Sequence, residues 1–192
     1  MCPDCQAEYD DPGNRRYHAQ PTGCPKCGPE LSLMRKGEPP LTGEDALQAA
    51  VQAIRSGQIV AIKGLGGFHL ACDARNPQAI ARLREKKLRS QKPFALMAVN
   101  LERIEQQCAL NNAERQLLTS QRSPIVLLNK RQDCDLPDGI APGQKTLGLM
   151  LPYTPLHVLL FDALSPQIPF LIMTSANRSE EPIICSEDSE DL

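Results

Sequence analysis

Four cysteines near the start of the chain have the spacing of metal ligands. Cys2 and Cys5 form one Cys-x-x-Cys pair, and Cys24 and Cys27 form a second pair after eighteen intervening residues. A Cys-x-x-Cys turn brings two thiolates within reach of one ion, and two such turns complete a tetrahedron. Because four sulfur ligands leave no open coordination position, the spacing predicts a structural zinc site. A reduced segment without metal is the alternative.

The other metal or redox candidates are isolated. His18 lies between the two cysteine pairs and is interpreted as a surface histidine, since the four thiolates already complete a site. A cysteine inside an apolar run usually behaves as a small core side chain. We expect no nucleophile among the remaining cysteines, which are Cys72, Cys108, Cys134 and Cys185.

A glycine-rich turn could bind an anion. The turn Lys63-Gly64-Leu65-Gly66-Gly67 comes directly after a predicted strand and before His69. Glycines allow backbone N–H groups to approach a phosphate, and Lys63 adds positive charge. Lys63 and Gly66 are therefore candidate phosphate-binding residues. The spacing matches neither a P-loop nor a dinucleotide fingerprint, so a structural turn is the alternative, with His69 as a core histidine.

A basic run ends the helix that is predicted over residues 77–88. Its charges up to Lys86 are explained by a solvated helix face. Lys87, Arg89 and Lys92 differ because they continue past the helix end toward a strand, where charges can converge on one polyphosphate. These three residues are candidate ATP-binding groups, with a solvated surface as the alternative.

Small polar residues follow the last predicted strand. The segment from Thr174 to Ser179 contains two serines, a threonine and an asparagine, and it begins where the apolar run 170–173 ends. Ligands of open α/β sheets bind beyond the carboxyl ends of strands. Ser175 and Asn177 are therefore candidates for contacts with phosphate or ribose, although an ordinary polar turn has the same composition.

Strands and helices alternate around these groups. Apolar residues from Leu47 to Ile54 repeat at helical spacing, and Gly57 follows as a stop signal. Apolar runs predict strands over residues 58–62, 68–72, 93–99, 125–128 and 170–173. Helices are expected over residues 77–88, 101–107, 112–119 and 154–164. Residues 129–145 are expected to form a polar loop. Such alternation predicts an α/β fold with an open twisted sheet and flanking helices, preceded by a small four-cysteine zinc-binding module.

The same patterns divide the chain. Residues 1–30 are turn-rich and form the expected zinc module, and residues 31–43 are expected to be a linker because Gly-Glu-Pro-Pro cannot continue a regular element. The predicted α/β domain occupies residues 44–185, and residues 186–192 form an acidic tail. A metal ligand at position 2 and this bare tail suggest a piece of a longer protein.

Composition limits the classes of function. With 41% hydrophobic and 23% charged residues, the chain has the composition of a soluble globular protein. The net charge of −2 and the small number of aromatic residues do not favour a strongly basic nucleic-acid surface or a base-stacking platform. No apolar run approaches the ~18 residues of a membrane span, and no signal peptide begins the chain. A cytoplasmic location is expected, where paired cysteines usually hold metal.

Together these motifs resemble the YrdC-like family. The matching segments are Lys87-Leu88-Arg89, Lys92-Pro93, Ser123-Pro124 and Thr174-Ser175-Ala176-Asn177. Preceded by a four-cysteine motif, their order is similar to the middle of the hydrogenase maturation carbamoyltransferases. The resemblance implies a domain that forms carbamoyl-adenylate from ATP and carbamate, with ATP contacts at Lys87, Arg89, Ser175 and Asn177.

The resemblance also implies partners. Carbamate would come from carbamoyl phosphate through a flanking acylphosphatase-like domain, and a kinase-like domain would pass the carbamoyl group to the C-terminal cysteine of a hydrogenase maturation partner. ATP would be a substrate, accompanied by Mg²⁺ as phosphoryl chemistry requires. Catalysis would depend on positioning and electrostatics, without a covalent nucleophile.

Two other functions remain open. The first is a threonylcarbamoyl-adenylate synthase for tRNA modification, whose threonine-binding segments differ from Lys63-Gly64-Leu65-Gly66 and from Met150-Leu151-Pro152 of this chain. Ser179-Glu180-Glu181 also departs from the Ser-Gly pattern that is usual after Ser-Ala-Asn. The second is a module without enzymatic activity that binds double-stranded RNA by shape.

Overall fold

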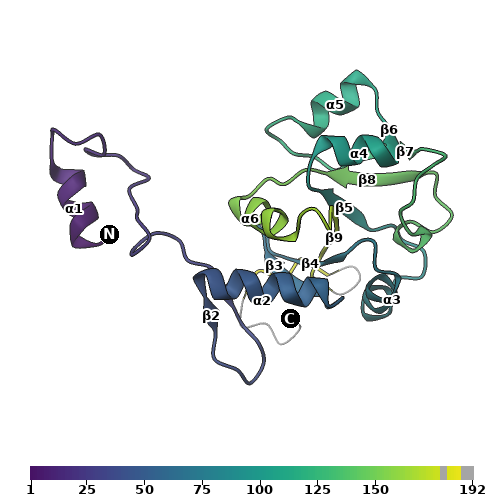
Figure 1. Ribbon diagram of the computed structural model, residues 1–192, viewed down its shortest axis with the longest axis horizontal. Helices are drawn as coiled ribbons and strands as arrows, with labels where there is room; N and C mark the ends of the chain where they lie inside the picture. Colours follow the sequence, from purple (N-terminus) through teal and green to yellow (C-terminus); the bar gives the residue numbers. More distant parts are fainter. Residues whose placement is uncertain (178–180, 187–192) are drawn as a thin grey trace. The chain divides into compact units, whose positions relative to one another are not determined.

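A seven-stranded sheet dominates the computed structural model, which describes residues 1–177 and 181–186. The chain divides into two compact units, residues 1–49 and residues 50–192 (Figure 1). Residues 178–180 of the predicted polar segment and 187–192 of the predicted tail lie outside the described residues. Among the described residues, no helix is both long and apolar enough to cross a membrane.

The first unit begins with a helix that the sequence did not indicate. Helix α1 (Pro3–Asp10) follows Cys2, with a proline at its start and Asp4 in its first turn. Proline is pre-organised for the first helical position, and an acidic side chain interacts favourably with the N-terminal end of the helix dipole. The description of residues 1–30 as turns alone is wrong at this helix, which buries only Cys5 and so lacks an apolar stripe.

A small strand pair lies in the segment that was predicted to be a linker. Strand β1 (Ser32–Leu33) pairs antiparallel with β2 (Leu41–Thr42), and the proline-containing turn lies between them. The amide of Gly43 donates to the carbonyl of Leu31 at 2.8 Å, which closes the pair. The prolines therefore interrupt regular structure as expected, but the flanking residues pair across them.

Helix α2 (Gly43–Arg55) confirms the amphipathic repeat that the sequence predicts. Val51 and Ile54 are buried, and the helix ends at Arg55, two residues before the expected glycine. Gly57 has a φ of +76°, and the amide of Gln58 donates to the carbonyl of Ala53 at 2.9 Å. A glycine adopts this left-handed conformation without steric cost, which explains the helix stop.

The strands of the second unit form one mixed sheet in the order β3-β4-β9-β5-β8-β7-β6. Of these neighbouring described strands, β5 and β8 are parallel and the other pairs are antiparallel. The strands are β3 (Val60–Lys63), β4 (Phe68–Asp73), β5 (Ala95–Ala98), β6 (Cys108–Ala109), β7 (Val126–Lys130), β8 (Thr146–Met150) and β9 (Phe170–Ser175).

Helices flank this sheet (Figure 1). They are α3 (Pro77–Lys86), α4 (Leu101–Gln107), α5 (Asn112–Leu118) and α6 (Pro155–Leu164), with a 3₁₀ turn at Asp138–Ile140. One core contains Ile80 and Leu83 of α3, Ile104 of α4 and alternate residues of the central strands, including Leu96 and Ile172. This alternation follows from the period of two along a strand. The predicted open sheet with flanking helices is confirmed.

Strand β8 was missed in the sequence because it contains a glycine. A Cβ added at Gly148 would lie 3.1 Å from the Cγ2 atom of Ile125, so the missing side chain permits a close approach. Glycine weakens the strand signal while allowing this packing. The predicted strand over 125–128 also begins one residue later and continues to Lys130.

Candidate functional site

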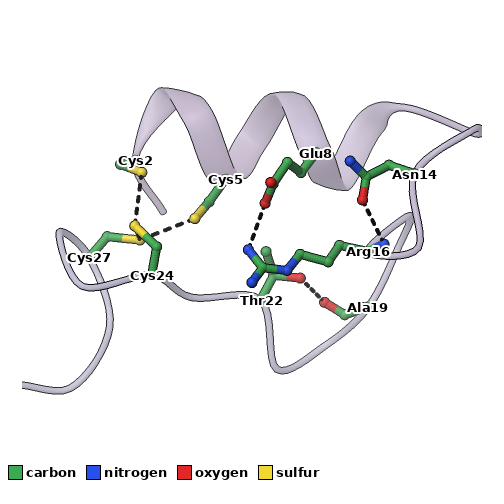
Figure 2. A network of polar contacts seen from close by, with 9 residues as sticks. All are labelled: Cys2, Cys5, Glu8, Asn14, Arg16, Ala19, Thr22, Cys24 and Cys27. Atoms are coloured by element: carbon green, nitrogen blue, oxygen red, sulfur yellow. Dashed lines mark hydrogen bonds and ion pairs between the residues drawn. The ribbon is translucent and has the colours of Figure 1, made fainter.

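The four predicted cysteine ligands converge in the first unit, as Figure 2 shows. Their sulfur atoms all lie within 4.8 Å of one another. The separations are 3.6 Å for Cys2–Cys24, 3.8 Å for Cys24–Cys27 and 3.7 Å for Cys5–Cys27. A tetrahedron with metal–sulfur bonds of ~2.3 Å has edges of ~3.8 Å. The donor atoms therefore fit a tetrahedral zinc ion.

Local backbone structure positions these sulfurs. Cys2 caps α1 and Cys5 lies in its first turn, so one helix end carries one pair. In the second pair, the amide of Gly28 donates to the carbonyl of Cys24 at 2.7 Å. A Cβ at Gly28 would lie 2.8 Å from that carbonyl oxygen, so a side chain at position 28 would collide with the turn.

The cysteines differ in their acidity. Backbone groups of Cys2 and Cys24 lower the pKa of Cys27 to about 6, and a backbone contact with Lys26 lowers the pKa of Cys24. Burial, followed by hydrogen bonds from the other thiols, raises the pKa of Cys5 to about 12. A thiol that ligates a metal is deprotonated, so a bound cation would compensate the burial of Cys5.

A polar network braces the loop between the two cysteine pairs (Figure 2). Arg16 donates from its guanidinium to Glu8 of α1 at 2.6 Å, and its amide donates to the side chain of Asn14 at 2.9 Å. His18 stacks on Tyr9 with a centroid distance of 4.8 Å and meets Tyr17 edge-on at 4.3 Å. His18 is thus a packing residue, and the four-cysteine cluster does not include it.

The second candidate site is a cavity of about 590 Å³ in the sheet unit. Four neighbouring strands (β4, β9, β5 and β8) contribute to its wall, as do the turn after β3, the segment before β7 and the residues before α6. The lining residues that can form hydrogen bonds through their side chains are His69, Arg89, Gln121, Arg122, Ser123, Tyr153, Thr174 and Ser175. The lining contains two arginines and no carboxylate, so it favours an anionic ligand.

Arg89 is held at the cavity by interactions on both sides. Its guanidinium donates to the hydroxyl of Thr174 at 3.1 Å and lies 5.7 Å from the centroid of the Phe94 ring. Arg84 supports the turn that carries it, because Arg84 donates to the backbone carbonyl of Arg89 at 3.1 Å and to that of Gly139 at 2.6 Å. Arg84, which was interpreted as a solvated charge, therefore has a structural role.

Lys87 is one of the few buried charged residues, with 7% of its surface exposed. Its ammonium donates to the carbonyls of Ser175 and Asn177 at 2.8 and 2.5 Å, and to the side-chain oxygen of Asn177 at 2.8 Å. An ammonium has three protons, so these contacts use its donor capacity. Burial, with Arg89 and Lys92 nearby, lowers the pKa of Lys87 to about 8. Lys87 does not belong to the cavity lining.

The segment after β9 is ordered by its own side chains. The hydroxyl of Ser175 donates to the side-chain oxygen of Asn177 at 2.8 Å, and the amide nitrogen of Asn177 donates to the carbonyl of Glu181 at 2.7 Å. Ser175 lines the cavity, whereas Asn177 lies behind it with Lys87. The structure thus brings Lys87, Arg89, Ser175 and Asn177 together, in two layers.

The other predicted phosphate-binding residues lie outside the lining. The ammonium of Lys63 lies 5.6 Å from the centroid of the Phe68 ring. Gly66 is exposed, and a Cβ added there would meet nothing within 4 Å. Lys92 is also exposed, and its carbonyl accepts a long contact from Arg84 at 3.4 Å. Phosphate binding by Lys63, Gly66 and Lys92 stays a prediction.

Several lining residues were not recognised in the sequence. No pattern in the sequence indicated Gln121, Arg122 or Tyr153. Each lies in a loop, and only the order of the strands in the sheet brings that loop to the cavity. His69 was interpreted as a hydrogen-bonded core residue, but it lines the cavity, and its buried Nδ1 atom makes no hydrogen bond of ordinary geometry. A histidine inside the apolar run that follows the glycine-rich turn was the available signal.

Two family models match the chain. The model described as "Telomere recombination", which groups Sua5, YciO and YrdC proteins, matches residues 52–190. The model described as "HypF finger" matches residues 1–34. The two matched segments agree with the predicted order of a cysteine module followed by a YrdC-like domain.

Individual relatives agree with these models. The carbamoyltransferase HypF of Rhodobacter capsulatus is 49% identical over 188 residues, which are 98% of this chain and 24% of that protein. A crystal structure of full-length HypF in a phosphate- and nucleotide-bound form is 43% identical, with a TM-score of 0.82 over 100% of this chain and 24% of its own. The threonylcarbamoyl-AMP synthase of Mus musculus is 27% identical over 150 residues, 77% of this chain and 52% of that protein. The chain thus spans about a quarter of the HypF relatives' length.

Proposed function

Because this chain belongs to the Sua5, YciO and YrdC family and resembles HypF from its cysteine module through its sheet unit, we propose that it is the adenylate-forming section of a HypF-type carbamoyltransferase. The section takes ATP and a carbamate derived from carbamoyl phosphate. Its product, carbamoyl-adenylate, carries the group that is transferred during maturation of nickel–iron hydrogenase.

The observation that carries this proposal is the pairing of Arg89 and Ser175 at one anionic-ligand cavity, backed by Lys87. Arg89 offers a planar set of donors suited to phosphate, and Thr174 and Ser175 add hydroxyls beside it. Lys87 holds the backbone of Ser175 and Asn177 in place. This supports a role for Lys87 as a positioning residue, while Arg89 and Arg122 face the substrate.

In the proposed reaction, a carboxylate oxygen of the carbamate attacks the α-phosphorus of ATP. A phosphorus–oxygen bond forms, the bond to the oxygen bridging the α- and β-phosphates breaks, and pyrophosphate leaves with that electron pair. The attacking oxygen is already anionic, so no side chain needs to remove a proton. Arg89 and Arg122 stabilise the charge on the phosphates, which is the main form of catalysis in phosphoryl transfer. Mg²⁺ would add charge neutralisation on the phosphate oxygens.

The cysteine module is proposed to bind one zinc ion for structure. Cys2, Cys5, Cys24 and Cys27 would occupy all four positions, which leaves no site for a substrate. Residues 1–30 contribute only Cys5 to the buried hydrophobic residues, so this segment buries little apolar surface. A bound zinc ion would therefore stabilise it in place of a hydrophobic core.

The wider context also belongs to the proposal. Carbamate would be supplied by an acylphosphatase-like domain, and a kinase-like domain would deliver the carbamoyl group to the C-terminal cysteine of a hydrogenase maturation partner. The location would be cytoplasmic. These roles come from the resemblance to HypF, of which this chain spans about a quarter.

The test measures pyrophosphate release from ATP by the full-length protein that contains this segment. Carbamoyl phosphate should stimulate release, and Arg89→Ala should abolish most of the stimulation while carbamoyl-phosphate hydrolysis continues. Release that requires threonine and bicarbonate instead would identify a threonylcarbamoyl-adenylate synthase. Salt-dependent binding of double-stranded RNA without any pyrophosphate would identify the binding module.

A further inference from the structure

His69 occupies a defined place in the cavity wall. It lies on β4 and is the direct cross-strand partner of Ser175 on β9. Directly paired residues of antiparallel strands project to the same face, with Cβ atoms about 4.5–5.5 Å apart. The two side chains therefore start from neighbouring positions on one face of the sheet, and both line the same cavity.

The surroundings of the ring fix which nitrogen a ligand can reach. The Nδ1 atom of His69 is buried without a hydrogen bond of ordinary geometry, and the polar group that acts on the ring is the backbone of Gly67. On that side lies Gly64, where an added Cβ would stand 2.9 Å from Nδ1 and 3.0 Å from Cε1. The ring thus fills space that only a glycine leaves open. Since Nδ1 is enclosed, Nε2 is the nitrogen available to a ligand in the cavity.

The ring is also kept neutral. Burial lowers the pKa of His69 below its usual value, so the imidazole is uncharged at neutral pH. Behind the cavity, His157 meets Tyr153 edge-on at 4.6 Å, and burial lowers the pKa of His157 to about 4. A neutral imidazole can accept a hydrogen bond only through its unprotonated nitrogen. Nε2 is that nitrogen when the proton is on Nδ1, on the side of the Gly67 backbone.

The other polar residues of the lining indicate which part of a ligand such an acceptor would bind. The arginines at positions 89 and 122 only donate, and they suit phosphate or carboxylate oxygens. The amino group of a carbamate needs an acceptor instead. No carboxylate lines the cavity, and the other acceptors there, the amide of Gln121 and the hydroxyls, are also donors. Building on the proposed function, we infer that His69 binds the carbamoyl end of the substrate and accepts a hydrogen bond from its amino group through Nε2.

The test uses the full-length enzyme and supplies carbamate from ammonium bicarbonate, so that carbamoyl-phosphate hydrolysis is bypassed. Pyrophosphate release is measured while carbamate or ATP is varied. His69→Leu should raise the KM for carbamate about tenfold or more and leave the KM for ATP within about twofold, because it removes a contact to only one substrate. His69→Gln, whose amide oxygen can replace Nε2 as acceptor, should recover part of this loss.

A matched control is His157→Phe, which changes a neighbouring histidine outside the cavity lining and should keep both KM values. His69→Asn is measured in parallel in case leucine disturbs β4, and it should show the same selective rise for carbamate. Unchanged carbamate KM in His69→Leu or in His69→Asn, or equal rises for carbamate and ATP, would overturn the inference. If the unsubstituted enzyme releases no pyrophosphate with carbamate, the proposed function itself fails, and this inference fails with it.

Discussion

The cysteine module and the cavity reach their chemistry by different routes. The four sulfur ligands lie within residues 2–27, and one helix end and one glycine turn bring them together. The cavity lining extends from Leu65 to Ser175 and depends on the order of four strands. A metal site can therefore be encoded locally, whereas the anion cavity needs the complete sheet. This difference predicts that the two regions respond separately to substitution.

The largest effect is expected from removing a zinc ligand. Cys24→Ser should abolish binding of the single zinc ion and unfold residues 1–30, because structural zinc contributes ~10–16 kcal/mol to such modules. Elemental analysis would measure the zinc, and circular dichroism would show that the sheet unit stays folded. Removal of zinc by a chelator from the unsubstituted protein should have the same effect. A full zinc equivalent in Cys24→Ser would contradict the four-thiolate site.

A core substitution should affect the opposite region. Leu96 is fully buried at the centre of the sheet, so Leu96→Ala should lower the free energy of unfolding of that unit by ~2–5 kcal/mol. Denaturant unfolding would measure the change, while the zinc content should stay constant. Leu127→Ala is the control, because Leu127 is 71% exposed and should change stability by no more than ~0.5 kcal/mol. Loss of zinc in Leu96→Ala would show that the regions depend on each other.

Within the cavity region, substitutions of Arg89 and Lys87 should differ in their effect on stability. Arg89→Ala and Lys87→Ala should each slow pyrophosphate release about ten- to a hundredfold, since a charge-assisted contact contributes ~1.5–3 kcal/mol. Only Lys87→Ala should also lower the free energy of unfolding, by ~1–3 kcal/mol, because it leaves the carbonyls of Ser175 and Asn177 without their donor.

Steady-state kinetics and denaturant unfolding of both variants would measure this contrast. Lys86→Ala removes an exposed charge of the same helix and serves as the control. Normal pyrophosphate release by Arg89→Ala would show that Arg89 does not contact the phosphates.

The smallest effect is expected at a helix end that contributes residues to neither site. Asn111 and Glu114 form a capping box at the start of α5, with mutual contacts of 2.9 and 2.8 Å. Asn111→Ala should lower stability of the sheet unit by ~1 kcal/mol, measured by thermal unfolding. Asn112→Ala, one residue further along, should change it much less. Zinc content and pyrophosphate release should remain normal in both variants.

Sequence reasoning succeeded where a signal was periodic or local. Helix α4 was predicted with its observed bounds, and α3 and α6 were placed by the proline that follows a capping residue. It failed where local signals were weak, as in α1, which has no apolar stripe, and in β8, which Gly148 interrupts. Strand β8 is held by pairing with β5 and β7, which leaves no periodic pattern in the sequence, whereas α1 buries only Cys5.

The sequence by itself determined the four-cysteine motif and the alternation of strands and helices, and its resemblance to the YrdC-like family grouped Lys87 and Arg89 with Ser175 and Asn177. Only the tertiary structure decided how those four residues divide, with Arg89 and Ser175 at the cavity and Lys87 and Asn177 behind it. It alone brought His69 beside Ser175, through the pairing of β4 with β9. The physical reason is that side-chain type and spacing define donors and ligands, whereas strand order and register decide which of them face the same space.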